Sequence, residues 1–318
     1  MKTTETSAVA AVEPVKAPET RARPRSRRRS GPLAVRRQRA GIVFALPVVA
    51  LVGSLLLYPT GQSVYYSFTN WDGISAHWIG TAAYAHLFHS PGFSQVLKNN
   101  AYMILAIPAA VLVALGTAFL IDTRPRGWRF FRSAIFLPTV ISWVVIGSIA
   151  VQFFQDNGLL QGLLDHSGLG MFHPNMLSHE GRALVAVMIT FIWSMLGCNM
   201  VIFLAGMATI DQEIYDAAKV DGAGPLKILF RITLPLLRRF AQFTFIFSLI
   251  MAFSGIFSLI FVMTGGGPGF GTTTLEFYIY QEAFSSGDFG TAATAGTVLF
   301  VAIFVISMLQ LRIFRGND

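Results

Sequence analysis

Residues 213–225 read E-I-Y-D-A-A-K-V-D-G-A-G-P and form a short charged segment, broken by glycine and proline, between two long apolar runs. Their acids and base could form ion pairs or dock on another protein. They do not form a nucleotide site, because the nearest glycine cluster, Gly222 to Lys227, lacks the G-x-x-x-x-G-K-[S/T] spacing that cradles phosphates. Cys198 is the one cysteine, and the histidines of 77–89 lack metal-ligand spacing, so we expect no metal site and no intrachain disulfide. The chemistry of this chain is therefore expected to be binding rather than catalysis.

The elements that must position this segment are apolar. Of the 318 residues 53% are hydrophobic and 13% are charged, against roughly 25% charged in a soluble domain. Six apolar runs are about as long as the 20 residues that cross a bilayer as a helix, and none contains Asp, Glu, Lys, Arg or His. They are 41–59, 101–121, 133–154, 183–206, 240–263 and 291–311. Since backbone groups in lipid must bond internally, the sequence predicts an all-α polytopic membrane protein with one helix per run.

Basic residues fall on one side of these runs. The tail carries nine arginines between Arg21 and Arg39, and the loops 122–132 and 207–239 are also rich in bases. By the positive-inside rule both termini are predicted to be cytoplasmic. The net charge of +8 is then a topology signal, and no nucleic-acid partner is expected. We interpret residues 1–40 as a disordered tail and 41–318 as the membrane domain, which includes the cytoplasmic loop 207–239.

The runs lack the buried ionisable groups with which many pumps relay protons. If the chain moves a solute uphill, the energy is expected to enter through a partner protein. The alternative is a self-contained carrier coupled to Na⁺, or a channel, because carbonyl and hydroxyl groups can coordinate Na⁺ without a charge.

The charged segment predicts two short helices. Glu213 to Asp221 suits a helix that Gly222 stops, and Pro225 suits the first position of a second helix ending near Pro235. On this second helix, Leu226, Leu229 and Phe230 are expected to share one face on the lipid headgroups. A loop that only marks topology is the alternative. The small residues beside projecting acids favour a docking surface.

Residues 213–236 closely resemble the E-A-A loop of the membrane subunits of binding-protein-dependent ABC importers. The family pattern is E-A-A, then D-G-A, then I-x-L-P, and Asp216 stands here where the family usually has Glu, which shortens the reach of that carboxylate by one methylene. The resemblance implies that this loop seats in a groove of a separate ATPase. The expected coupling residues are Glu213, Asp216, Ala217, Ala218, Asp221, Gly222, Ala223, Leu234 and Pro235.

Two further stretches are similar to sugar-uptake permeases of this family. Residues 265–284 look like their outer segment before the last helix, in which Gly266, Gly267 and Pro268 would lie on the binding-protein side, and residues 67–93 look like their first outer loop. The resemblance implies the type I importer permease fold in a bacterial inner membrane, similar to the first subunit of maltose permeases. It also implies a second permease subunit, two ATPase subunits and an extracytoplasmic sugar-binding protein as partners. ATP and Mg²⁺ would bind the ATPase, with no cofactor in this chain.

A substrate path is expected inside the membrane helices. Thr244, Ser248, Ala252 and Gly255 form one stripe of the fifth run at helical spacing. In the resemblance, Ser248, Ala252, Gly255 and the region of Trp193 match sugar-contacting positions. Close packing of helices through small residues is the alternative use of this stripe. Asn199 is expected to bond a neighbouring helix rather than to face the path.

Overall fold

The computed structural model describes residues 44–167 and 175–315. By its contacts the chain divides into two units, Met1–Leu57 and Tyr58–Asp318. In the first unit, residues 44–57 are helical, include the π-helical turn η1 (Gly53–Leu57), and have no buried side chain. The predicted tail, residues 1–40, lies outside the described residues. All remaining elements belong to the second unit.

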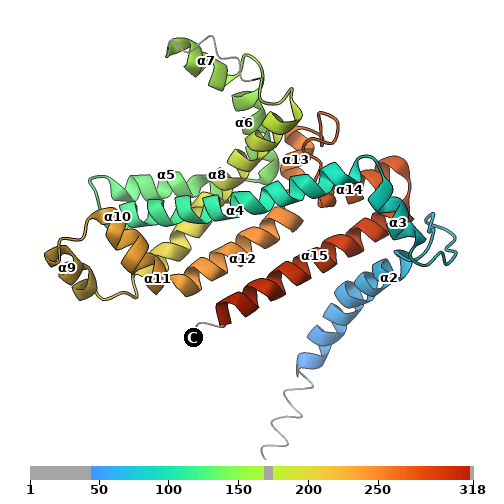
Figure 1. The fold of residues 1–318 in the computed structure, drawn as a ribbon, viewed down its shortest axis with the longest axis horizontal. Helices are drawn as coiled ribbons and strands as arrows, with labels where there is room; N and C mark the ends of the chain where they lie inside the picture. Colours follow the sequence, from blue (N-terminus) through green and yellow to red (C-terminus); the bar gives the residue numbers. More distant parts are fainter. Residues whose placement is uncertain (1–43, 168–174, 316–318) are drawn as a thin grey trace, which may run out of the picture. The chain divides into compact units, whose positions relative to one another are not determined.

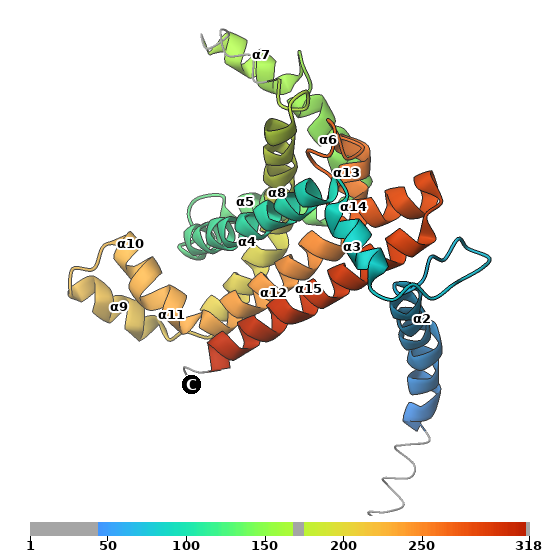
Figure 2. The same ribbon diagram turned by 45° about the vertical axis from the view of Figure 1, so that its right-hand side comes forward.

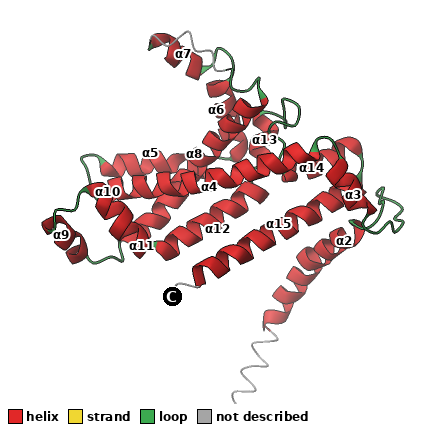
Figure 3. Cartoon of the chain, viewed as in Figure 1, coloured by secondary structure: helices red, strands yellow, loops and turns green. Residues whose placement is uncertain are grey.

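The described residues of the second unit form helices and contain no strand, apart from an isolated antiparallel bridge between Thr69 and Trp78 (Figure 3). The elements, labelled in Figure 1, are α2 (Tyr58–Tyr66), α3 (Ala82–His89), α4 (Phe93–Asp122), α5 (Trp128–Val140), α6 (Trp143–Phe154), α7 (Leu159–His166), α8 (Glu180–Met207), α9 (Gln212–Val220), α10 (Pro225–Ile228), η2 (Leu229–Thr233), α11 (Leu234–Leu236), α12 (Arg238–Ser254), α13 (Phe257–Met263), α14 (Leu275–Tyr280), η3 (Gln281–Ser286) and α15 (Phe289–Arg315).

Four helices of the described chain are long and apolar enough to cross a membrane. They are Phe44–Tyr66, α4, α8 and the part Phe289–Gln310 of α15. Two pairs of bent helices raise the number to as many as six: Trp128–Val140 with Trp143–His166, bent by 107°, and Pro225–Leu236 with Arg238–Ser254, bent by 80°. The all-α prediction is confirmed.

The prediction of one continuous helix per apolar run is wrong for the third and fifth runs. The third run is divided between α5 and α6 at Ile141 and Ser142, which have extended backbone, shortly after Pro138. Proline inside a helix removes one i→i−4 hydrogen bond, so Pro138 weakens the last turn of α5, which ends two residues later. The fifth run is divided between α12 and α13 at Gly255, which adds no side chain to hold helical geometry.

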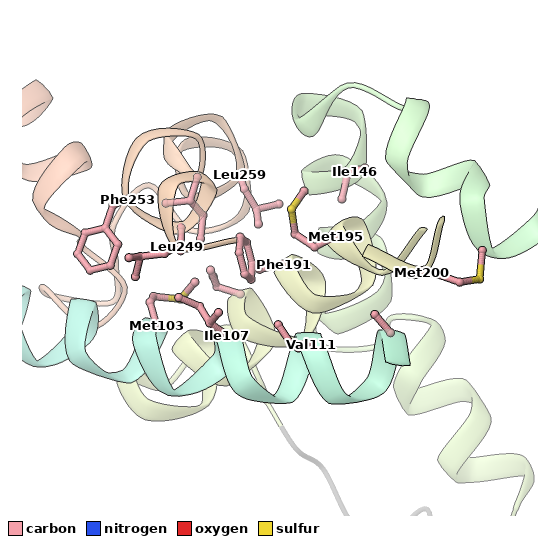
Figure 4. Close-up of a cluster of buried hydrophobic side chains, with 14 of the residues drawn as sticks. Met103, Ile107, Val111, Ile146, Phe191, Met195, Met200, Leu249, Phe253 and Leu259 are labelled. Carbon is pink, nitrogen blue, oxygen red and sulfur yellow. The ribbon is translucent and has the colours of Figure 1, made fainter. Parts of the chain in front are cut away.

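The core lies where α4, α6, α8, α12 and α13 pack together. Its largest cluster includes Met103 and Ile107 of α4, Phe191 of α8 and Leu249 of α12, which Figure 4 shows pointing toward one another. These side chains are almost completely buried. Hydrocarbon packing of this kind fixes the helices that carry the polar segments described next.

Candidate functional site

The charged segment folds as two short helices, as predicted. Asp211 occupies the N-cap position of α9 without a capping bond from its side chain, and Glu213 lies in the first turn, where a negative charge complements the helix dipole. The helix ends at Gly222, whose φ is +71°. The N–H of Ala223 donates to the carbonyl of Ala218 at 2.9 Å, and that of Gly222 to the carbonyl of Lys219 at 3.0 Å. These two bonds define a Schellman motif, which needs the left-handed backbone that glycine adopts at low cost.

The two helices enclose a small core of their own. Tyr215 and Ala218 of α9 and Ile228 of α10 are buried against one another, and Phe119 of α4 packs against the same cluster. The hydroxyl of Thr233 lies 3.5 Å from that of Tyr215. The views in Figures 1 and 2 agree that α9 and α10 lie where α4 ends. The segment 212–236 is therefore a packed hairpin attached to a long helix.

The face of α9 turned away from this core, together with the end of the helix, carries four of the nine predicted coupling residues. Glu213, Asp216, Ala217 and Asp221 are exposed. Asp216 pairs with Lys219 at 3.0 Å, and hydrogen bonds from Lys219 and then Gln212 lower the pKa of its carboxyl. Ala218 is buried, so the two adjacent alanines face different surroundings. The small side chain of Ala217 adds little bulk to the exposed face of α9. The small side chain of Ala218 allows α9 to pack closely against Ile228 of α10.

The apolar residues of the second helix differ from the prediction. Leu226 and Phe230 are exposed, but Leu229 is buried beside Ile228. Leu229 packs into the main core of the helices, whereas Ile228 packs into the core of the hairpin. Sequence reasoning also missed Val220, which is 88% exposed at the end of α9. Val220 and Leu226 add exposed apolar side chains to the charged face.

The predicted path residues do not all come together. Thr244, Ser248 and Ala252 of α12 are fully buried, and Gly255 ends this helix. Trp193 of α8 is 40% exposed and lines a cavity of about 370 Å³ with Phe153 of α6 and other apolar residues. The structure thus separates Trp193 from the stripe on α12.

Asn199 bonds a neighbouring helix, as predicted, but its partner Ser248 belongs to the path stripe, so the expectation that Asn199 turns away from this stripe is wrong. Its side-chain N–H₂ on α8 donates to the hydroxyl of Ser248 on α12 at 3.0 Å, and both residues are fully buried. Its carbonyl oxygen is buried without a hydrogen-bond partner. The hydroxyl of Thr244 donates to the carbonyls of Phe240 and Ala241 within α12. In this arrangement of the helices, the polar atoms of the stripe are occupied by the chain itself.

The first part of the stretch 265–284, together with Thr264, forms a tightly bonded loop, and this loop of residues 264–274 is called the outer segment from here on. Gly266 is buried with a φ of +85°, and an added Cβ would lie 2.7 Å from both Phe277 and Thr273. The Thr272 hydroxyl donates to the carbonyl of Gly267 at 2.9 Å, and the Thr273 hydroxyl to that of Gly266 at 2.9 Å. The predicted residues Gly267 and Pro268 are partly exposed within this loop.

Asn99 of α4 holds the outer segment in place. Its side-chain N–H₂ donates to the carbonyl of Phe270 at 2.7 Å and to that of Thr273 at 2.9 Å. Asn99 is fully buried, so little water is available to replace its side chain as a hydrogen-bond donor. Sequence analysis did not assign this role, since the contact joins residues more than 170 positions apart.

We expect Asn99→Ala to release this loop. The buried carbonyl of Thr273 would lose the Asn99 donor, at a cost of about 1–3 kcal/mol, and the carbonyl of Phe270 would keep only its bond from the N–H of Thr273. Asn100→Ala is the matched control, because Asn100 is also buried but bonds only the carbonyl of Val96 in its own helix. Thermal unfolding in detergent should show a larger loss for Asn99→Ala than for Asn100→Ala. Equal losses would contradict the assigned role of Asn99.

Glu276 is a second residue that sequence analysis did not single out. It lies on α14, and its carboxylate accepts the backbone N–H of Phe257 at 3.0 Å. Burial raises the pKa of this carboxyl to about 7, against the lowering effect of bonds from the N–H groups of Phe257 and Ile256. Among the described residues, no group of His, Cys, Asp and Glu is placed to hold a metal ion.

Comparisons with known proteins agree with this architecture. Residues 78–316 match the family described as the inner membrane component of binding-protein-dependent transport systems. A protein of Pyrococcus horikoshii described as a probable ABC transporter permease is 32% identical over 87% of this chain and 96% of its own length. The sulfoquinovosyl glycerol transport system permease of Agrobacterium fabrum is 31% identical over 87% of this chain and 91% of its own.

A solved structure shares the fold. A chain of a bacterial ABC transporter involved in the import of the acidic polysaccharide alginate superposes with a TM-score of 0.76 and 21% sequence identity. The match covers 89% of this chain and 98% of that chain. The family match covers most of the sequence and includes the α9–α10 hairpin. The chain therefore belongs to the inner-membrane permease components of binding-protein-dependent ABC transport systems.

Proposed function

We propose that this chain is one of two permease subunits through which an ATP-driven importer carries a sugar or oligosaccharide into the cell. The observation that supports this best is the α9–α10 hairpin. It is a packed unit with its own core, it carries an exposed charged face, and its core includes Phe119 of α4. A push on such a unit would move α4 with it, as coupling to an external motor requires.

We infer that the hairpin docks on the ATPase and that both termini are cytoplasmic. Asp122, Arg124 and Arg132 line a cavity with the end of α8, so the basic connection between α4 and α5 lies beside the connection to the hairpin. Bases gathered at one end of membrane helices favour a cytoplasmic location for that end. The arrangement supports six membrane spans, with each bent region inside the membrane domain, and a bacterial inner-membrane location.

The docking face would be formed by Glu213, Asp216, Ala217, Asp221 and Gly222, with Ala218, Ala223, Leu234 and Pro235 maintaining the hairpin's shape. Val220 and Leu226 would add apolar contacts at its end. ATP and Mg²⁺ would bind the partner ATPase alone. Family membership disfavours the self-contained carrier, because the family is described as binding-protein-dependent.

The substrate class follows from relatives and from the helices. One relative is named for sulfoquinovosyl glycerol and one structural neighbour for alginate, both of which contain sugar units. In this chain, the predicted path stripe offers hydroxyls and no charge. We therefore propose a substrate recognised through hydroxyl groups, with Ser248 becoming available when α8 and α12 separate. An extracytoplasmic binding protein would deliver it near Gly266, Gly267 and Pro268.

Reconstitution in vesicles tests this function. The chain purified alone should concentrate no labelled sugar under an imposed ion gradient. With a second permease, the ATPase and the binding protein, uptake should appear and should require ATP hydrolysis. Ion-driven accumulation by the chain alone would overturn the proposal.

A further inference from the structure

The break between α12 and α13 leaves backbone N–H groups that need acceptors. The first N–H groups of any helix have no partner within that helix. Here the N–H of Phe257, the first residue of α13, donates to Oε2 of Glu276 at 3.0 Å. The N–H of Ile256 also bonds this carboxylate. Glu276 thus accepts hydrogen bonds from the backbone N–H groups of Ile256 and Phe257, where the fifth run is interrupted.

Glu276 connects two regions that are separate in the sequence. It lies on α14, which directly follows the outer segment with Gly266 and Pro268. That segment is bonded to α4 through Asn99. Glu276 is also bonded to Ile256, which directly follows Gly255, the last residue of the path stripe. A displacement of the outer segment would therefore reach the broken helix through this carboxylate.

Few charges surround this carboxylate. No charged side chain contributes to the upward shift of its pKa, which arises from burial and is opposed by the two backbone bonds. The helix α13 has no charged residue. The charged residues of the other elements packed against α14 are Lys98 and Asp122 on α4, Arg238 and Arg239 on α12, Glu282 on η3, and Arg312 and Arg315 on α15. Tyr278 on α14 stays neutral, since its pKa is raised to about 12 by burial and by Glu282.

We propose, on the basis of the function proposed above, that Glu276 is a positioning residue for transport, and that its protonation sets how firmly the outer segment holds the break between α12 and α13. The carboxyl does not touch substrate. It holds the backbone next to Gly255 in place. In this way it sets the width of the proposed substrate path at the bend of the fifth run.

The direction of the pH effect follows from linkage. The pKa of this acid is raised from 4.5 to about 7 in the folded protein, so the folded state binds the proton more tightly than the unfolded state. The resulting stability is present below the unfolded pKa and is lost as pH rises through about 7. The folded chain is therefore more stable relative to the unfolded chain when Glu276 is protonated, because burying the charge costs more than the two N–H bonds to the carboxylate return.

The first experiment compares Glu276→Gln and Glu276→Ala with wild type. Glutamine keeps an acceptor oxygen and does not titrate, so the melting temperature of wild type relative to Glu276→Gln should fall from about pH 5 to about pH 8. Hydrogen exchange of the Ile256 and Phe257 amides should be about tenfold faster in Glu276→Ala and unchanged in Glu276→Gln. Glu282→Gln is the control, because it removes an acid from the next element without touching the break.

The second experiment measures uptake by the assembled transporter. Glu276→Ala should lower the maximal rate with little change in KM, and Glu276→Gln should restore the rate while removing the pH dependence seen between about pH 5 and 8. Parallel pH profiles for wild type and Glu276→Gln, or unchanged exchange in Glu276→Ala, would overturn this inference. Absence of ATP-dependent uptake by wild type would instead refute the proposed function, and the exchange and melting measurements, which need no transport, would still decide the role of Glu276.

Discussion

Gly222→Glu is expected to abolish uptake and to remove the ATPase from the purified complex, while leaving the chain in the membrane. The substituted side chain would project from the end of α9, where the proposed ATPase groove must approach closely. It meets no atom of this chain within 4 Å of its Cβ, so the hairpin has space for it. The φ of +71° adds a backbone cost of roughly 1–2 kcal/mol for a residue with a Cβ.

Gly287→Glu separates these two effects. Gly287 has a φ of +73° and also meets nothing within 4 Å, but it follows η3 on the proposed outer side. Its substitution therefore has the same backbone cost and the same added charge without touching the docking face. We expect Gly287→Glu to keep the ATPase and most of the uptake. Gly222→Asn is a second control, because asparagine tolerates the left-handed conformation.

Co-purification of the ATPase and ATP-dependent uptake are the two measurements. A loss of at least about tenfold in both for Gly222→Glu, equivalent to about 1.4 kcal/mol of docking free energy, would support the assignment of the hairpin. If Gly222→Glu and Gly287→Glu reduced ATPase co-purification and uptake equally, the cause would be the backbone strain that both share. The docking face would then have to lie elsewhere.

The hairpin shows why local signals could be read from the sequence. Gly222 stops α9 and Pro225 begins α10 because each residue restricts its own backbone, whatever surrounds it. The apolar runs were predictable for a similar reason, since lipid requires long uncharged helices. The burial of Leu229 was not predictable in this way, because it depends on packing against residues that are distant in the sequence.

Contacts between segments distant in the sequence were harder to predict. The bond of Asn199 to another helix was predicted because Asn199 and Trp193 point in different directions from the same helix, although the sequence did not identify Ser248 as its partner. The bonds from Asn99 to the outer segment and from Phe257 to Glu276 were missed. In both cases the polar partner is a backbone group, and backbone groups leave no signature in residue type.

The second large effect concerns the packing of α8 on α5. Gly197 of α8 lies against the backbone of α5: an added Cβ would be 2.7 Å from the Cα of Phe136 and 2.8 Å from the carbonyl oxygen of Ile135. It would also lie 2.5 Å from the hydroxyl oxygen of Thr139. Backbone atoms cannot turn aside as a side chain can, so the helices would have to separate. Small residues at such contacts are the general means by which membrane helices approach closely.

We therefore expect Gly197→Leu to prevent accumulation of folded protein in the membrane, with a cost above the roughly 1–3 kcal/mol typical of overpacking against movable side chains. Gly116→Leu is the matched control, because Gly116 is in the long helix α4 and meets nothing within 4 Å. Membrane yield and the melting temperature in detergent measure both variants. Since α8 also carries Asn199 and Trp193, a separation of α8 from α5 would displace the bond to Ser248 and the cavity beside α6 together. Normal yield and stability of Gly197→Leu would show that the two helices are free to separate, and the close packing of α8 on α5 would not be required for folding.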